Sequence, residues 1–265
     1  MSEKSPSHQV NGDLSPPFDI SVPKSTPTQT RIPAIRAHDL IRRIGTPRAN
    51  TTVSTESTEG DKEYPRRFKD YTVLQQHVLF WDRDEDGQIY PWDTYKGFRE
   101  LGFNVLFSLL ALFIIHLGFS YPTRLGYSWL PDPLFRVYVG SIHKAKHGSD
   151  SETYDSEGRF RPQQFEDMFA KYDSKGDGTL TLSELFQLMH GNRNALDPFG
   201  WGAAVFEFGT TWLLIQKDGK CYKEDVRGVY DGSIFWRIRE ERAKGKGWNQ
   251  GWGIGGDRFV GSVKI

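Results

Sequence analysis

The sequence predicts a mainly α-helical protein in which an EF-hand-type helix–loop–helix pair is split by a membrane-embedded apolar helical hairpin with a proline-rich turn. Three observations support this: two acidic loops between helical stripes, one uncharged apolar run, and a first segment almost without aromatic residues. The expected parts are a disordered tail (1–63), a first EF-hand (64–100), the hairpin (101–142), a C-terminal helical domain with a degenerate second EF-hand (143–242) and a Gly-rich tail (243–265).

The disordered N-terminal tail is predicted from composition. Residues 1–62 hold 7 of the 14 prolines and a single aromatic residue, Phe18. Such a segment buries too little apolar surface to offset the chain entropy that folding removes. We therefore expect order to begin near Tyr64, where a helical stripe of aromatic and aliphatic residues starts.

Charge and cysteine content exclude some classes of protein. The chain has 34 basic and 34 acidic side chains, so no basic excess points to nucleic acid, and no nucleic-acid partner is expected. The single cysteine, Cys221, excludes a disulfide framework and a cysteine-based zinc site.

The first acidic loop, residues 82–93, has the pattern of a calcium-binding EF-hand. The six ligand positions hold Asp82, Asp84, Asp86, Gln88, Tyr90 and Asp93. Gly87 stands at the sharp turn, and alternating carboxylates suit a hard cation such as Ca²⁺. The last position is Asp93 where Glu is usual, and its shorter side chain predicts weaker calcium binding.

The second acidic loop, residues 173–184, keeps only part of this pattern. Its candidate ligands are Asp173, Asp177, Thr179 and Glu184. Lys175 places a cation where the second ligand belongs. Two interpretations remain open: a weak second ion site, or an EF-hand fold kept without a metal ion. We expect the two loops to form the halves of one pair, although they begin 91 residues apart, at 82 and 173.

An apolar run from Leu101 to Tyr121 carries no formal charge. A membrane span needs about 20 such residues. Three prolines, Pro122, Pro131 and Pro133, follow within twelve residues and predict a turn. The stretch 134–142 is then expected to return, which would leave both ends of the hairpin on one side of a membrane. The alternative is a soluble protein in which the run is a core helix.

Three of the seven histidines are candidates for a site: His77, His143 and His147. His77 lies about one helical turn before the first acidic loop. His143 and His147 are four residues apart, so on a helix they would share a face, which allows metal ligation but also suits a solvated face. Spacing alone therefore defines no haem site.

Four blocks of sequence lie between Val73 and Phe235: VLQQHVLFWDRDEDGQIYPWDTYKGFRELGFN, IHKAKHGSDSETYDSEGRF, GNRNALDPFGW and DGSIF. Together they resemble the caleosin family, also called the plant and fungal peroxygenases, and the chain is identified as a fungal-type member. The resemblance implies a calcium-binding haem peroxygenase, which transfers oxygen from a fatty-acid hydroperoxide to an unsaturated fatty acid by epoxidation or hydroxylation. It also implies a monotopic protein of the lipid-droplet surface and endoplasmic reticulum membrane, in contact with a lipid monolayer or membrane.

The resemblance further implies two cofactors, haem b and Ca²⁺, with one calcium site expected and the second doubtful. In the family, the histidine just before the calcium loop and two in the I-H-K-x-K-H-G-S-D block are tied to haem and to activity. These match His77, His143 and His147 here, with His77 as the axial ligand. The competing interpretation is a non-catalytic, calcium-responsive protein that anchors to or coats lipid droplets. Exposed apolar surface also allows a homo-oligomer.

Overall fold

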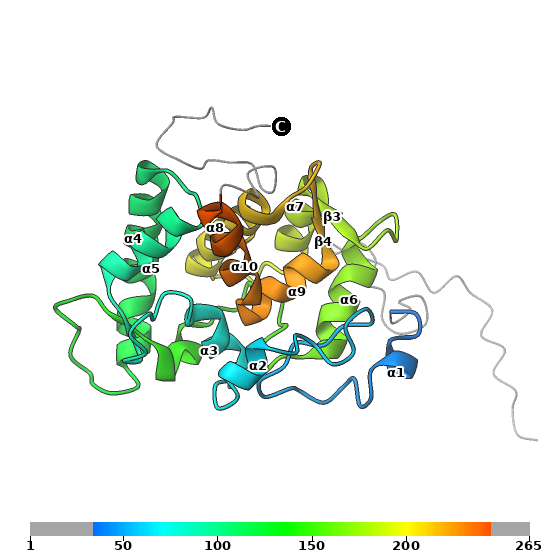
Figure 1. The fold of residues 1–265 in the computed structure, drawn as a ribbon, viewed down its shortest axis with the longest axis horizontal. Coiled ribbons are helices and arrows are strands. Elements are labelled where there is room, and N and C mark those ends of the chain that lie inside the picture. The colour runs from blue at the N-terminus through cyan, green and yellow to red at the C-terminus, as the bar shows by residue number, and fades with distance from the viewer. Residues whose placement is uncertain (1–33, 245–265) are drawn as a thin grey trace, which may run out of the picture. The chain divides into compact units, whose positions relative to one another are not determined.

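The computed structural model describes residues 34–244, so the first part of the predicted tail and the Gly-rich tail after Lys244 lie outside the described residues. The helices are α1 (Ala37–Leu40), α2 (Tyr64–Arg67), α3 (Val73–Val78), α4 (Pro91–Glu100), α5 (Val105–Arg124), the 3₁₀ helix η1 (Val139–Ala145), α6 (Pro162–Tyr172), α7 (Leu182–Gly191), α8 (Pro198–Ile215), α9 (Lys223–Asp231) and α10 (Ser233–Ala243). The strands are β1 (Gln88–Ile89), β2 (Val137–Tyr138), β3 (Thr179–Thr181) and β4 (Lys220–Tyr222). The prediction of a mainly α-helical protein is confirmed (Figure 1).

Helices α3 and α4 flank the first acidic loop. Thr72 and Gln75 form a capping box that starts α3. Asp93 starts α4 by accepting a hydrogen bond from the backbone N–H of Tyr90 at 3.1 Å. Between the helices, Gly87 has a φ of 78°, a left-handed conformation that glycine adopts without steric cost. Local sequence thus explains this helix–loop–helix.

The two acidic loops do not pair with each other, and that part of the fold prediction is wrong. Strand β1 of the first loop is antiparallel to β2, with Ile89 opposite Val137. Strand β3 of the second loop is antiparallel to β4, with Leu180 opposite Cys221. Each loop therefore pairs with a segment that follows it in the chain. The partner segments lack the alternating carboxylates of an EF-hand, which is why the motif did not identify them.

The apolar run forms one long helix, and the chain then returns along it, but not as the second helix of the predicted hairpin. Helix α5 continues through Pro122, which lies in its last turn. The stretch 134–142, expected to return as a helix, instead forms β2 and the start of η1. It is held by β1 and by Thr123, whose carbonyl accepts a hydrogen bond from Ser141 Oγ at 2.6 Å. Pairing with β1 of the first acidic loop therefore guides the path of the chain here.

The packed part of the chain begins before Tyr64, the predicted start of order. Residues 34–63, assigned to the disordered tail, include buried positions and lie against α9. Thr52 Oγ1 donates a hydrogen bond to Asp231, and Ser57 Oγ donates one to Glu224 at 2.6 Å. These polar contacts hold a segment that is poor in aromatic residues, and they do not depend on the apolar surface that the segment lacks.

One apolar core joins the helices, with Phe80, Phe160, Phe165, Leu180 and Leu188 fully buried in it. Helices α8, α9 and α10 lie between the pair α4 and α5 and the pair α6 and α7 (Figure 1). Residues 34–244 fall within one compact unit.

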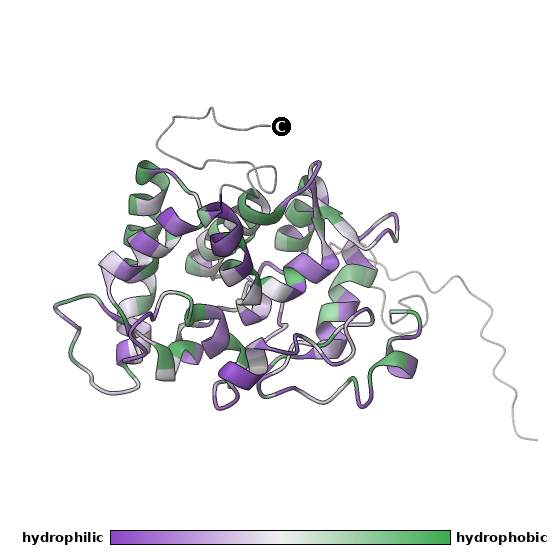
Figure 2. Ribbon diagram, in the orientation of Figure 1, coloured by the Kyte–Doolittle hydropathy of each residue, from purple (hydrophilic) through white to green (hydrophobic). Residues whose placement is uncertain are grey.

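Helix α5 has its polar residues inside and its apolar residues outside. The buried positions are Ser108, Ala111, His116, Ser120 and Thr123. The exposed positions include Leu106, Leu109, Leu110, Phe113 and Leu117. Within residues 34–244 it is the one helix that is long and apolar enough to cross a membrane, and Figure 2 colours the helices by hydropathy. Of its most apolar window, 22% is buried. The run is thus a candidate membrane-embedded element and does not have the burial of a core helix.

Candidate functional site

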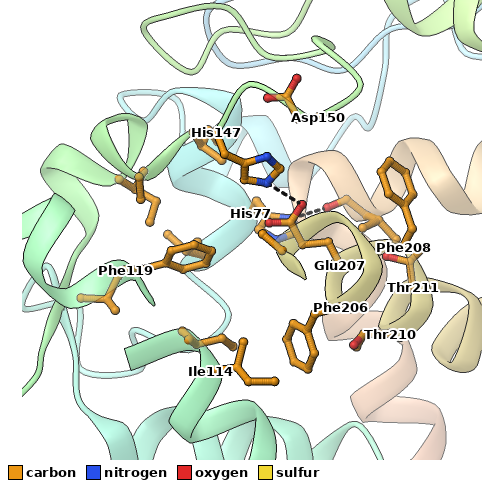
Figure 3. A pocket seen from close by; sticks show the side chains of 18 of the residues that line it. His77, Ile114, Phe119, His147, Asp150, Phe206, Glu207, Phe208, Thr210 and Thr211 are labelled. Carbon is orange, nitrogen blue, oxygen red and sulfur yellow. Dashed lines mark hydrogen bonds and ion pairs between the residues drawn. The ribbon is translucent and has the colours of Figure 1, made fainter. Parts of the chain in front are cut away.

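A cavity of about 580 Å³ lies between α3, α5, α8, α9 and α10. This volume is in the range of small-molecule binding sites. Most of its wall is apolar, and includes Val78, Ile115, Phe119, Phe206, Leu214 and Phe235. Figure 3 shows that His77, His147, Glu207 and Asp150 lie together at one end, whereas Ile114, Phe119 and Phe206 lie at the other.

His77, on α3, is fixed in one orientation at this wall. Its Nδ1–H donates a hydrogen bond to the carbonyl of Val229 at 2.6 Å, so in the neutral ring Nε2 carries the lone pair. Nε2 has no hydrogen-bond partner within the described residues. Burial lowers the pKa of His77, which keeps the imidazole neutral. A neutral imidazole oriented by a backbone carbonyl is the form that binds a metal.

His147 faces the same cavity beside an acidic residue of α8. Its Nε2 lies 3.5 Å from Oε2 of Glu207. Burial by itself would lower the pKa of His147, but the hydrogen bond and charge of Glu207 outweigh it, so the pKa is raised. Nδ1 of His147 is buried and has no hydrogen-bond partner within residues 34–244. Burial also raises the pKa of Asp150, another residue of the cavity wall.

His143 is placed outside this cavity, although Ile142, Ala145 and Lys146 line it. The expectation that His143 and His147 share a helix face is not met. The segment is a 3₁₀ helix that ends at Ala145, and with three residues per turn, positions four apart do not align. The structure therefore brings His77 and His147 together and leaves His143 apart.

The first acidic loop gathers three of its six predicted ligands. Carboxylate oxygens of Asp82, Asp84 and Asp86 lie within 4.8 Å of one another. Asp82 accepts a hydrogen bond from the backbone N–H of Gly87 at 3.0 Å. Burial raises the pKa of Asp82 to about 6, and the charges of Asp86 and Asp84 add to the rise. A hard cation would relieve this repulsion, so the cluster could hold a metal ion.

The side chains of Gln88 and Asp93 have protein partners, and the ligand atom expected of Gln88 is its backbone carbonyl. The Gln88 side-chain oxygen accepts a hydrogen bond from Arg136 at 2.8 Å. Asp93 accepts one from the backbone of Tyr90, as described above, and lies 3.9 Å from Lys96. The three carboxylates of the first half of the loop are the cluster that could hold a metal ion.

Carboxylates of the second acidic loop form hydrogen bonds and an ion pair with other groups of the protein. Glu184 accepts hydrogen bonds from the backbone N–H groups of Ser174 at 2.9 Å and Thr181 at 2.8 Å. Burial alone would raise the pKa of Glu184, but the hydrogen bond from Ser174 Oγ and these backbone bonds lower it to about 2. Asp177 forms an ion pair of 2.7 Å with Lys220 of β4. Asp173 and Thr179 complete the predicted set, and within residues 34–244 no metal cluster is found at this loop.

Sequence reasoning did not identify two groups of the cavity. Glu207 is the single charged residue of α8, an otherwise apolar helix, and an isolated charge in such a segment is a signal for function. The Val229 carbonyl that orients His77 has no signal in the sequence, because it is a backbone group 152 residues away.

Comparisons with known proteins cover the same residues. Residues 69–239 match the profile of a family described as "Caleosin related protein". The chain is 43% identical over 187 residues to a peroxygenase of Lilium longiflorum, covering 70% of this chain and 75% of that protein. It is 40% identical over 174 residues to probable peroxygenase 4 of Arabidopsis thaliana, covering 64% and 87%. It is also 32% identical over 153 residues to a probable inactive peroxygenase-like protein of Arabidopsis thaliana, covering 56% and 70%. No solved structure matches.

Proposed function

The chain belongs to the caleosin family, and on that premise we propose that it is a haem-dependent peroxygenase. In the proposed reaction, a fatty-acid hydroperoxide gives one oxygen atom to an unsaturated fatty acid, and the products are an alcohol and an epoxide or hydroxylated acid. Family membership alone does not decide activity, because one relative is named probable inactive. The observation that carries the proposal is His77, a neutral imidazole whose Nε2 is left without a hydrogen-bond partner at the wall of an apolar cavity.

The residues of the cavity fit haem b. His77 would hold the iron through Nε2, and the apolar wall would enclose the porphyrin. The buried, unpartnered Nδ1 of His147 also fits a site that receives a further group. When bound, haem would supply the iron centre at which the peroxide O–O bond is broken and from which oxygen is passed on.

His147 and Glu207 would move the proton of this reaction. Conversion of a hydroperoxide to an alcohol needs no outside electrons, since the second substrate takes the oxygen. A proton has only to pass from one peroxide oxygen to the other as the bond breaks. Neutral His147, held beside Glu207 at 3.5 Å, is a suitable group to take that proton from the peroxide and to give it to the departing oxygen. Apolar residues of the wall would exclude water and hold the acyl chain.

Oxygen transfer by purified, haem-loaded protein tests the proposed function. We expect linoleic acid hydroperoxide labelled with ¹⁸O in both peroxide oxygens to convert oleic acid to an epoxide that carries ¹⁸O. The hydroperoxide should become the hydroxy acid in equal amount, as mass spectrometry of the products would measure. Absence of labelled epoxide would overturn the proposal and favour the alternative, a calcium-responsive anchor or coat of lipid droplets.

The pH dependence of kcat/KM should show the effect of Glu207 on the pKa of His147. Glu207 raises the pKa of His147, so His147 is protonated below that raised pKa and loses its proton as the pH rises through it. Because His147 must be neutral to take the proton from the peroxide, we expect kcat/KM to fall on the acidic side, as the pH drops below this pKa. Glu207→Gln removes the charge and leaves burial, which lowers the pKa, so the fall should move to lower pH. Glu240→Gln, at an exposed site on α10, is the control, and an identical profile for all three proteins would contradict the role of Glu207.

We also propose that the first loop binds one Ca²⁺ and helps to position His77. The loop begins five residues after His77. Trp81 lies between the two, with its ring 6.2 Å from that of His77 and 5.7 Å from that of Phe98 on α4. An ion that fixes α3 against α4 would thus act on His77 through Trp81.

Calcium binding should depend on the first loop alone. We expect Asp82→Ala to weaken Ca²⁺ binding by about tenfold or more, because it removes the buried carboxylate of the cluster. Asp173→Ala, the same change at the first position of the second loop, should leave affinity and stoichiometry unchanged. Isothermal titration calorimetry measures both. Two calcium ions in the wild type, one of them lost with Asp173→Ala, would show that the second loop is a site.

The proposed location is the surface of lipid droplets and the endoplasmic reticulum membrane, with the chain entering from one side. The exposed apolar face of α5 supports this proposal. A helix without charge over 19 residues before Arg124 gains free energy when lipid covers its leucine and phenylalanine side chains.

A further inference from the structure

Two helices with exposed apolar faces border the cavity, and two aromatic contacts join them. Phe107 of α5 and Phe206 of α8 stack with ring centroids 6.1 Å apart. Phe119 of α5 and Phe199 of α8 meet edge to face at 6.2 Å. Residue numbers rise along α5 and fall along α8 between these contacts, so the two helices are antiparallel here. The contacts therefore mark the two ends of a gap between α5 and α8.

Ile114 of α5 and Gly202 of α8 lie midway between these contacts. Both residues are exposed and both line the cavity. A Cβ atom placed on Gly202 would have no atom within 4 Å. A residue that faces both the cavity and the outside marks an opening, and Figure 3 shows Ile114 at the apolar end of the cavity, near Phe206. We call the gap bounded by Ile114 and Gly202 the window.

The outer surface around the window is suited to lipid. On α5 it is flanked by Leu110, Phe113 and Leu117, and on α8 by Trp201 and Val205, all exposed. The surface therefore continues across the window from the apolar face of α5 to α8. Trp201 donates a hydrogen bond from Nε1 to the carbonyl of Asn194 at 2.7 Å. An exposed Trp with its polar end held at the rim is typical of the boundary between lipid and water.

The inside of the cavity offers no free cation to a fatty-acid carboxylate. Lys146 is the one Lys or Arg among the wall residues of the described chain. Its Nζ donates hydrogen bonds to the carbonyls of Tyr154 at 2.6 Å and Asp155 at 3.2 Å, and it lies 3.7 Å from Asp150. A carboxylate moved from water into this cavity would lose its hydration without gaining an ion pair.

We propose that acyl substrates pass from a lipid surface into the cavity through the window between Ile114 and Gly202, hydrocarbon end first, while their carboxyl or ester end stays at the surface. This inference rests on the proposed function and names its substrate class. The substrates are acyl chains presented by lipid, and they include chains esterified in phospholipid or storage lipid, because the cavity does not need to bind the carboxyl group.

Closing the window should slow the uptake of an acyl chain from lipid. Gly202→Trp puts a large side chain into the gap, where there is room for it. Gly209→Trp is the matched control, because Gly209 also lies on α8 and has no atom within 4 Å of a Cβ, but it does not line the cavity. The probe is cis-parinaric acid in dioleoylphosphatidylcholine vesicles, mixed with the full-length, haem-loaded protein and followed by stopped-flow fluorescence.

We expect uptake to slow by about tenfold or more in Gly202→Trp and to stay within about twofold of wild type in Gly209→Trp. A second pair of variants, on α5, shows whether slower uptake in Gly202→Trp comes from closing the window or from misfolding. Ile114→Trp closes the window from α5, and Leu106→Trp adds the same side chain to an exposed position of α5 that neither flanks the window nor lines the cavity. Equal uptake rates in the window variants and their controls would overturn the inference.

Oxygen transfer separates this inference from the proposed function. With a phospholipid-esterified hydroperoxide in vesicles as donor and thioanisole as acceptor, wild type should form the sulfoxide and Gly202→Trp should form it about tenfold more slowly. Equal rates would overturn the inference and leave the function. Wild-type protein that takes up parinaric acid through the window but transfers no oxygen would overturn the function and leave the inference.

Discussion

His77→Ala is expected to remove the Soret band of haem-loaded protein and to lower oxygen transfer by about two orders of magnitude or more. In the proposed site, His77 is the neutral imidazole whose Nδ1–H is held by the carbonyl of Val229 at 2.6 Å. Alanine leaves no metal ligand at this point of the wall. The surrounding helices should remain folded, because His77 is at the edge of the cavity and not at the centre of the core.

The matched variant is His143→Ala, which removes a histidine that does not line the cavity. It should keep the Soret band and most of the activity. Absorption spectra and product analysis of the three proteins measure both effects. A band that persists in His77→Ala would refute His77 as the ligand. A band lost in His143→Ala would instead mean that the 3₁₀ segment η1 rearranges when haem binds.

Features encoded in short stretches of sequence could be predicted. The cluster of Asp82, Asp84 and Asp86 follows from their spacing, because an EF-hand loop brings alternating carboxylates to one point. The uncharged, apolar composition of residues 105–121 likewise indicated the position of α5. In both cases the residues that interact are within one or two turns of one another.

Features that depend on distant segments could not be predicted in the same way. The hairpin and the EF-hand pair were inferred from prolines and acidic motifs, but the pairing of β1 with β2 decides where the chain goes after α5. The polar contacts of residues 34–63 with α9 involve partners about 170 residues away. The periodicity of apolar residues along the sequence does not indicate contacts between such distant segments.

The cavity combines both situations. His77 and His147 were identified through the family resemblance. The block DGSIF, residues 231–235, was one of the four blocks that carry this resemblance, but the sequence gives no physical reason for that block. The structure supplies that reason: Gly232 lies against the backbone of α3, and the ring of Phe235 lies 5.3 Å from that of His77. This block forms the surface on which His77 rests.

Gly232→Ala should therefore displace His77 and destabilise the protein by about 3 kcal/mol or more. Gly232 has a φ of +78°, which costs an L-residue about 1–2 kcal/mol. In addition, an added Cβ would lie 2.9 Å from the carbonyl oxygen of Gln76 and 3.0 Å from that of His77. These are backbone atoms, so α3 itself must move. Urea unfolding and haem titration measure the two consequences.

Gly219→Ala separates the cost of the left-handed backbone conformation from the cost of the contact between an added Cβ and α3. Gly219 has nearly the same φ, +76°, but a Cβ there would have no atom within 4 Å. We expect this variant to lose only the cost of the left-handed conformation, about 1–2 kcal/mol, and to bind haem like the wild type. Gly232→Ala should lose more stability and also weaken haem binding, because the added methyl group pushes on the residue that holds it. If the two variants lost equal stability and both bound haem normally, the close approach of Gly232 would not be what positions His77.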